Sequence, residues 1–362
     1  MIYSIFPSKD LTIYEDEIYL NSGMDSVLEL SKTIDTYITN TRILMKFDLD
    51  DIPSQAIIAS ASYYLNLTST EVREIPLSYD IYAHPLSGSW EMGTGKSDYV
   101  PIVKEGASWE FRDGYTPQTP WYVSSSYDSG SATYYYVSES GGGIWFTSSE
   151  ASQSYEYESA DVRMDVSDIV NDWNNSIIEN EGFIIKRSNA DESSSAALGS
   201  IKFYSVDSHT IFPPRLEVCW DDSEFNTGSL DPLLSGSTYI DEIVLNVKNL
   251  RPEYKQDTKT KIRVTGRERY PIRTYSTVSS YLGTKYLPSS SYYSVKDMAS
   301  EEIVIPFDDD YTKVSCDSRG NYVNLWMSGF QAERFYRILF KVIDEEGNEE
   351  YFDGDYFFKI VR

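Results

Sequence analysis

The segment spanning residues 163–220 constrains the fold more than any other part of the sequence. It contains the pieces MDVSDIVNDW, GFIIKR, IKFYSVDSH and PPRLEVCW in that order. In the first piece apolar residues recur at i, i+3, i+4 and i+7, namely Val166, Ile169, Val170 and Trp173. This spacing predicts an amphipathic helix that Asp165 or Ser167 can cap.

The three pieces after this helix are rich in Ile, Phe, Tyr and Val and are separated by polar or Pro-containing breaks. Such runs are typical of short strands, so we expect them to pair into one sheet on which the helix lies. Their partner strands have to come from residues 1–90. Residues 163–220 are therefore predicted to close a domain that begins at the N-terminus.

Length and aromatic content favour two β domains. A chain of 362 residues exceeds the ~100–200 residues of a single domain. Aromatic residues make up 15 % of it, with 31 Tyr. Because Tyr suits half-buried pleated surfaces, this excess favours all-β modules with surfaces that contact sugars or proteins.

Charge and cysteine content exclude several classes of protein. The 57 acidic and 31 basic side chains give a net charge of −26, which disfavours binding to nucleic acid or to an anionic membrane surface. Cys219 and Cys316 fall in different predicted domains, so we expect no disulfide framework and no thiolate metal site. We also expect no signal peptide and no membrane span, and hence synthesis in a cytoplasm.

A polar stretch at 221–236, DDSEFNTGSLDPLLSG, marks the predicted boundary between domains spanning 1–222 and 223–362. Beyond it, six runs separated by turn signals predict strands: YIDEIVLNV, TKIRVTGRE, EEIVIPF, YVNLWM, YRILFKVID and YFFKIV. Six strands in about 130 residues are typical of an immunoglobulin-like β-sandwich.

Residues 1–222 resemble a known module. TRILMKFDLDDIPSQAIIASASYYLNL resembles the first half of DNRLRE-type modules, and SGSWEMG, EGASWEFRDG and TPWYV resemble their tryptophan-containing steps. MDVSDIVNDW, GFIIKR, FYSVDS and PPRLEVCW resemble the closing helix and strands of that family. The resemblance implies a jelly-roll-like β-sandwich with one short helix, which in this family is sometimes a carbohydrate-binding module and often an appendage or surface piece.

Residues 93–155 form an insertion dominated by Tyr, Ser, Thr and Gly. Because a loop of this length is usually functional or disordered, and because this composition resembles that of antibody paratopes, we expect an interaction surface here. The candidate contact residues are Trp109, Trp121, Tyr122, Tyr127, Tyr134, Tyr135, Tyr136 and Trp145. GGGIWF and EGASWEFRDG also resemble segments of structural proteins of tailed bacteriophages.

Motifs for catalysis or metal binding are weak. The two histidines, His84 and His209, favour surface or packing roles, and GTGKS at 93–97 lacks the first Gly of a phosphate loop. Acidic runs at 48–51 and 308–310 are interpreted as solvated turns rather than Ca²⁺ sites. The number of acidic residues does not exclude a pair of carboxylates that acts as in a glycosidase. We therefore predict a protein that is not an enzyme and that has no cofactor and no metal.

Two functions fit these features. The first is a structural component of a bacteriophage virion, in its tail, neck or fibre attachment, which docks in several copies onto other virion proteins. The second is a carbohydrate-binding module of a cell-surface or secreted polysaccharide-active system. The first function places the protein in the virion after synthesis in the host cytoplasm. A glycan remains a candidate partner in both cases.

Overall fold

A computed structural model describes residues 1–34, 38–58, 61–121, 135–137, 141–156, 159–234, 239–271 and 283–362. Strands dominate this part of the chain, which confirms the predicted all-β fold class. Contacts divide the chain into two units. The N-terminal unit consists of Ile5–Pro53 and Ser62–Glu217, and the C-terminal unit consists of Met1–Ser4, Ser54–Ala61 and Val218–Arg362.

This division differs in detail from the boundary predicted at residue 222. It falls between Glu217 and Val218, and two segments from the predicted first domain, Met1–Ser4 and Ser54–Ala61, group with the C-terminal unit. Composition marks linkers but does not reveal which distant segments a strand contacts. Independent folding of the two predicted domains stays a prediction.

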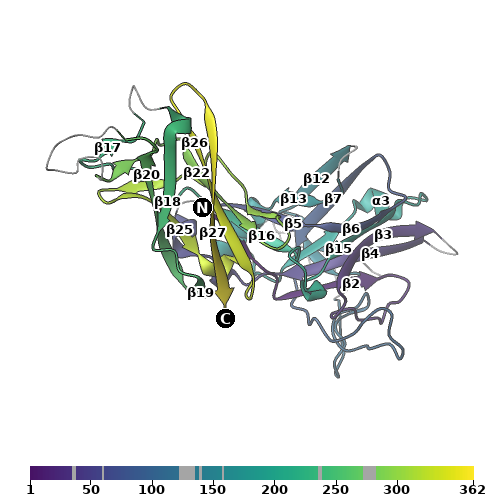
Figure 1. The fold of residues 1–362 in the computed structure, drawn as a ribbon. Helices are drawn as coiled ribbons and strands as arrows, with labels where there is room; N and C mark the ends of the chain where they lie inside the picture. Colours follow the sequence, from purple (N-terminus) through teal and green to yellow (C-terminus); the bar gives the residue numbers. More distant parts are fainter. Residues whose placement is uncertain are drawn as a thin grey trace. The chain divides into compact units, whose positions relative to one another are not determined.

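The larger sheet of the N-terminal unit has the strand order β12-β7-β14-β4-β3-β15-β6, and β2 also pairs with β4. In Figure 1, β3, β4, β15 and β6 lie side by side, with β2 next to β4. Among the described residues, the strand pairs of this sheet are antiparallel. The strand bounds are β2 (Lys9–Tyr14), β3 (Val27–Ile34), β4 (Ile38–Lys46), β6 (Ser69–Arg73), β7 (Ser78–Pro85), β12 (Ala151–Glu156), β14 (Phe183–Lys186) and β15 (Gly199–Tyr204).

A second sheet has the order β1-β16-β5-β13, with β1 (Ile2–Ile5), β5 (Ser62–Leu67), β13 (Val162–Asp165) and β16 (Arg215–Cys219). Two small hairpins lie within the predicted insertion. They pair β8 (Phe111–Asp113) with β9 (Thr119–Pro120), and β10 (Tyr135–Val137) with β11 (Ile144–Phe146).

The predicted closing segment contains the expected helix and strands, but its strands do not share one sheet. Helix α2 (Ser167–Asn174) buries Ile169, Val170 and Trp173, as its spacing predicts. Strands β14 and β15 join the larger sheet, whereas β16 joins the second one. The prediction of a single sheet is wrong because alternation of apolar residues indicates a strand without indicating its partner.

Helix α2 contacts β14 of the larger sheet and β5 of the second sheet, which both belong to the N-terminal unit. Its Trp173 ring packs edge-on against Phe183 of β14, with 4.7 Å between ring centroids. On the other side, the Ser167 hydroxyl accepts the backbone N–H of Tyr63 in β5 at 2.9 Å, and Asn174 donates to the Tyr63 hydroxyl at 3.2 Å. The helix therefore closes the domain by joining the two sheets.

Two further short helices were not expected. Residues 57–67 were predicted as a strand, but helix α1 (Ser54–Ile58) precedes β5, which begins at Ser62. Pro53 directly before this helix suits a helix start, because its ring fixes φ. Helix α3 (Asn189–Ser193) begins after Ser188, whose hydroxyl accepts the backbone N–H of Asp191.

The C-terminal unit contains two sheets, and all six strands predicted there are present. One sheet has the order β17-β21-β20-β25-β24, with β18 also pairing with β20, and the other has the order β19-β27-β26-β22-β23. The strand bounds are β17 (Asp231–Pro232), β18 (Ile243–Lys248), β19 (Glu253–Lys255), β20 (Lys259–Glu268), β21 (Lys285–Tyr286), β22 (Ser291–Asp297), β23 (Ile303–Ile305), β24 (Ser315–Asp317), β25 (Gly320–Trp326), β26 (Phe335–Ile343) and β27 (Glu349–Val361).

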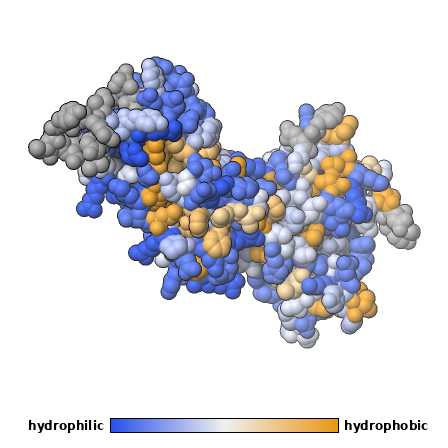
Figure 2. All heavy atoms as spheres, in the orientation of Figure 1, coloured by the Kyte–Doolittle hydropathy of each residue, from blue (hydrophilic) through white to orange (hydrophobic). Residues whose placement is uncertain are grey.

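The core of the C-terminal unit is aromatic. Phe330, Tyr336 and Phe358 are each buried, and their ring centroids lie 4.8 to 6.0 Å apart. By contrast, the face of the molecule shown in Figure 2 is mostly hydrophilic, with separate apolar patches. A surface of this kind agrees with the net charge of −26 and keeps a Tyr-rich protein dispersed.

Candidate functional site

The three tryptophans expected on the interaction surface lie inside the N-terminal unit. Trp109 and Trp121 are 2 % exposed and Trp145 is 1 % exposed. They share one core cluster with Trp90. The indole N–H of Trp121 donates to the Ser108 carbonyl at 2.9 Å, so its polar atom stays bonded in the core. The prediction that these rings form a contact surface is wrong, because the insertion supplies part of the hydrophobic core.

The predicted contact tyrosines fall into two groups. Tyr122, Tyr127 and Tyr134 lie outside the residues that the structure describes. Tyr135 and Tyr136 belong to β10, where they stand opposite Phe146 and Trp145 of β11. A contact role for these five tyrosines stays a prediction.

A buried ion pair fixes the tryptophan core. The guanidinium of Arg42, in β4, lies 4.7 Å from the Trp109 ring and 5.1 Å from the Trp145 ring. Its Nε and Nη2 donate to both carboxylate oxygens of Glu192 at 3.0 and 2.8 Å. Its Nη1 donates to the Gly142 carbonyl at 2.5 Å. A planar guanidinium suits this combination of stacking and bidentate bonding.

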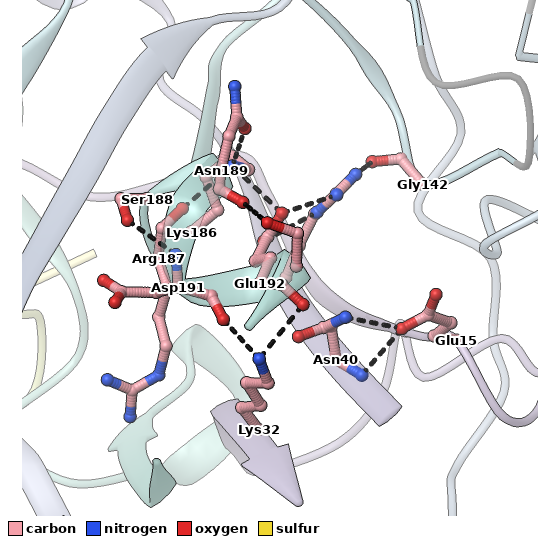
Figure 3. A network of polar contacts seen from close by, with 12 residues as sticks. Glu15, Lys32, Asn40, Gly142, Lys186, Arg187, Ser188, Asn189, Asp191 and Glu192 are labelled. Carbon is pink, nitrogen blue, oxygen red and sulfur yellow. Dashed lines mark hydrogen bonds and ion pairs between the residues drawn. The ribbon is translucent and has the colours of Figure 1, made fainter. Parts of the chain in front are cut away.

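Two lysines extend this network around helix α3 (Figure 3). The ammonium of Lys186 lies 3.0 Å from Glu192, and burial lowers the pKa of Lys186 to about 8. Lys32 donates to the carbonyls of Glu192 and Ser194 at 3.1 and 2.6 Å. Every contact in this network is made within the N-terminal unit, and its effect is to hold α3 and the rings in place.

A single buried amide anchors the first part of the insertion. Asn21 is 0 % exposed. Its side-chain nitrogen donates to the carbonyls of Met92 and Ala107 at 2.7 and 2.8 Å, and its side-chain oxygen accepts the N–H of Gly95 at 2.8 Å. Its backbone N–H donates to the Val103 carbonyl at 3.1 Å. Both ends of residues 96–104, which we call the docking loop, are therefore tied to one point.

Glycines permit this close approach. A Cβ added at Gly95 would lie 2.1 Å from the Asn21 carbonyl oxygen. Gly106 has a φ of +98°, and a Cβ there would lie 2.5 Å from the Gly93 Cα. Larger residues would have to displace backbone at both positions. The GTGKS sequence thus serves to pack a loop against Asn21, in agreement with its interpretation as a false phosphate loop.

The tip of the docking loop is apolar and exposed. It consists of four consecutive apolar or aromatic residues at 99–102. Val103, which follows them, is half-buried. Tyr99, Val100 and Ile102 are 66 %, 91 % and 45 % exposed, and Pro101 between them is exposed as well. Contiguous exposed apolar side chains on an anchored loop are typical of a contact surface, because a folded chain otherwise covers them.

An acidic groove of about 530 Å³ lies at the start of this loop. Ser97 and Asp98 line it together with strands β2 and β3. Its other acidic side chains are Asp16, Glu17, Asp25, Glu29 and Glu71. One lysine, Lys202, lines the groove and lies 3.7 Å from Glu29 and 3.8 Å from Glu71. The groove therefore presents a negative surface beside the apolar tip.

Burial raises the pKa of one acidic residue in this groove, Asp25. The carboxylate of Asp25 accepts the backbone N–H of Ser97 at 3.2 Å, which connects the groove wall to the docking loop. Desolvation raises the pKa of Asp25 above its usual range, and this hydrogen bond partly opposes the shift. Asp25 thus contributes to loop positioning as well as to the negative field.

Sequence reasoning predicted an interaction surface within residues 93–155, and the structure buries three of its candidate side chains, Trp109, Trp121 and Trp145. The run YVPI at 99–102 was the available signal, because four apolar residues follow a Gly, Lys and Asp-rich stretch. Tryptophan and tyrosine content drew attention to residues 109–145 instead. Asn21 could not be identified, because its partners lie more than seventy positions away.

The two histidines and the acidic turn at 308–310 were also considered in the sequence as candidates for catalysis or metal binding. His84 is 8 % exposed and lies 6.0 Å from the Trp145 ring, and burial lowers the pKa of His84 to about 4. His209 is exposed. Asp308 accepts the backbone N–H groups of Asp310 and Tyr311 at 2.9 Å within an acidic turn. Within the described ranges, no group of three or more His, Cys, Asp or Glu side chains could hold a metal ion.

Among the described residues, no helix is both long and apolar enough to cross a membrane. No family model matches the chain, and no curated protein matches it. Among solved structures, the adhesin domain of Epf from Streptococcus pyogenes is similar over 93 % of this chain and 78 % of that chain, with 7 % identity and a TM-score of 0.16. A similarity this low carries no argument about fold or function.

Proposed function

We propose that this protein is a non-enzymatic structural component of a bacteriophage virion, in the tail, neck or fibre attachment, that works by docking onto other virion proteins. The observation that carries the proposal is the docking loop, whose base is anchored by Asn21 and whose tip exposes Tyr99, Val100 and Ile102. The resemblance of residues 1–222 to DNRLRE-type modules, which are often appendage pieces, supports this class of function.

The geometry specifies the partner's chemistry. An apolar tip held by its base loses little conformational entropy on binding, so it can insert into an apolar pocket of a neighbouring protein. The acidic groove next to it favours lysines and arginines at the rim of that pocket. We therefore expect attachment to slow as salt concentration rises, because salt screens charges at the rim of an interface.

A variant with Tyr99→Ser, Val100→Ser and Ile102→Ser tests this function. Because these side chains are exposed, the free energy of unfolding should change by less than about 0.5 kcal/mol per site. Incubation with particles assembled without this protein, followed by sedimentation, should show a sharp loss of attachment.

The matched control replaces exposed apolar residues elsewhere in the same unit, Leu77→Ser with Ile177→Ser, which are 67 % and 66 % exposed. This control should attach as the unmodified protein does. Equal attachment of the tip variant and the control would contradict the proposal. A mass spectrum of whole particles gives the copy number, which is predicted to be several per particle.

A further inference from the structure

A separate groove of about 450 Å³ lies entirely within the C-terminal unit. This volume falls in the ~300–1,000 Å³ range of small-ligand sites. Its floor is formed by β20 and β25, and its wall by residues 220–224, which follow β16. None of the features assigned to docking contributes to it.

The floor combines aromatic, amide and ammonium groups. In the antiparallel register, Lys259 stands opposite Trp326, and Lys261 stands opposite Asn324. Trp326 and Asn324 are half-buried, and both lysines are exposed. The Lys259 ammonium lies 4.3 Å from the Trp326 ring centroid. An exposed contact of this kind is worth only ~0.5–1 kcal/mol, so a ligand can displace the lysine from the ring.

The wall adds carboxylates and is fixed in place. The backbone N–H of Cys316 donates to the Glu224 carbonyl at 2.8 Å, which ties the wall to β24. The Tyr322 hydroxyl donates to the Glu224 carboxylate at 3.3 Å. Asp221 also lines the groove. Each carboxylate has lone pairs beyond these contacts and can accept further hydrogen bonds.

Trp220 also lines the groove and has one more potential donor. It is 2 % exposed, and among the described residues its indole N–H has no acceptor. A buried N–H without a partner costs about 1–3 kcal/mol. An oxygen atom from a ligand that reaches this side of the groove would satisfy it.

This set of groups suits one class of ligand. Ring faces favour the C–H face of a sugar, whereas Asn324, Glu224 and the lysines can bond its hydroxyls. The acidic wall disfavours a nucleic-acid backbone. We propose that the groove binds a saccharide.

Binding of neutral and uronic-acid oligosaccharides to the full chain, measured by calorimetry and ligand-observed NMR, tests this proposal. Trp326→Ala should weaken the affinity about tenfold or more, and Asn324→Ala about fivefold, as expected for central contact residues. Trp326→Phe keeps an aromatic ring and should lose only about threefold, which guards against a misfolded alanine variant.

The matched control is Phe335→Ala. Phe335 is an aromatic residue of the same unit, 45 % exposed, with the Lys359 ammonium 5.9 Å from its ring, and it lies outside the groove. Its replacement should leave saccharide binding unchanged, as should the docking-loop variant. Absence of binding to every oligosaccharide, an equal loss in Phe335→Ala, or binding of any polyanion that salt abolishes would each overturn the proposal.

Discussion

The tip of the docking loop and the tryptophan core behind it belong to one aromatic-rich insertion and have opposite environments. Val100 is 91 % exposed, whereas Trp109, nine positions later, is 2 % exposed and lies against Arg42. The difference teaches that aromatic content does not mark a contact surface by itself. The surroundings of each side chain determine its burial: Trp109 packs into the core, whereas the side chains at the tip of the anchored loop stay exposed.

The largest expected effect comes from removing a ring from the core. Trp109→Ala should lower the free energy of unfolding by about 3–5 kcal/mol, because it leaves a cavity and removes a contact of the Arg42 guanidinium. Denaturant unfolding measures this loss. The matched variant at the tip, Tyr99→Ala, should change stability by less than about 0.5 kcal/mol. Similar losses in both variants would break the comparison.

Acidic residues repeat the contrast between buried and exposed positions. Asp98 in the groove is exposed. Asp10 in β2 is 1 % exposed and accepts the backbone N–H of Val206 at 2.8 Å. Burial raises the pKa of Asp10 from its ordinary value of 3.8 to about 7. The folded state therefore retains this proton between pH 4 and 7, whereas the unfolded state releases it.

The sign of the resulting pH dependence follows from linkage. The contribution of Asp10 to stability is present below pH 3.8 and is lost as pH rises through 7. His84 acts in the opposite sense: its pKa is lowered from 6.5 to about 4, so its contribution is lost as pH falls through that window. The two effects oppose each other in the unmodified protein.

Asp10→Asn separates these effects. The difference in the free energy of unfolding between the variant and the unmodified protein should shift in favour of the variant by on the order of 3 kcal/mol from pH 4 to pH 8. The reason is that the variant has no carboxylate to ionise in the core. Chemical denaturation of both proteins at pH 4, 6 and 8 gives this difference. A difference that stays constant with pH would show that Asp10 is not held protonated by burial.

Local patterns predicted more of the fold than of the site. The spacing of Ile169, Val170 and Trp173 identified α2, and runs of apolar residues identified six strands of the C-terminal unit but missed others, such as β22. Sheet partners could not be predicted, since β14 and β16 have similar patterns and enter different sheets. Helix α1 is too short to show a period.

The site depends on contacts between distant residues. Asn21 has no distinguishing neighbours in sequence, and its role arises from carbonyls at 92 and 107. Burial of Trp109 and Trp145 depends on Arg42, which enters from another strand. Composition located the insertion, but only the packing separates its structural half from its exposed tip.

Backbone hydrogen exchange, measured on the free protein and on the protein attached to particles, tests the docking role of the tip most directly. In the free protein, exchange should be fast at Asp98 and Val100 and slow at Gly95 and Ala107, whose N–H groups are bonded at the loop base. Attachment should slow exchange at the tip about tenfold or more and leave the base unchanged. Unchanged exchange at the tip in attached protein, with protection elsewhere, would contradict the account.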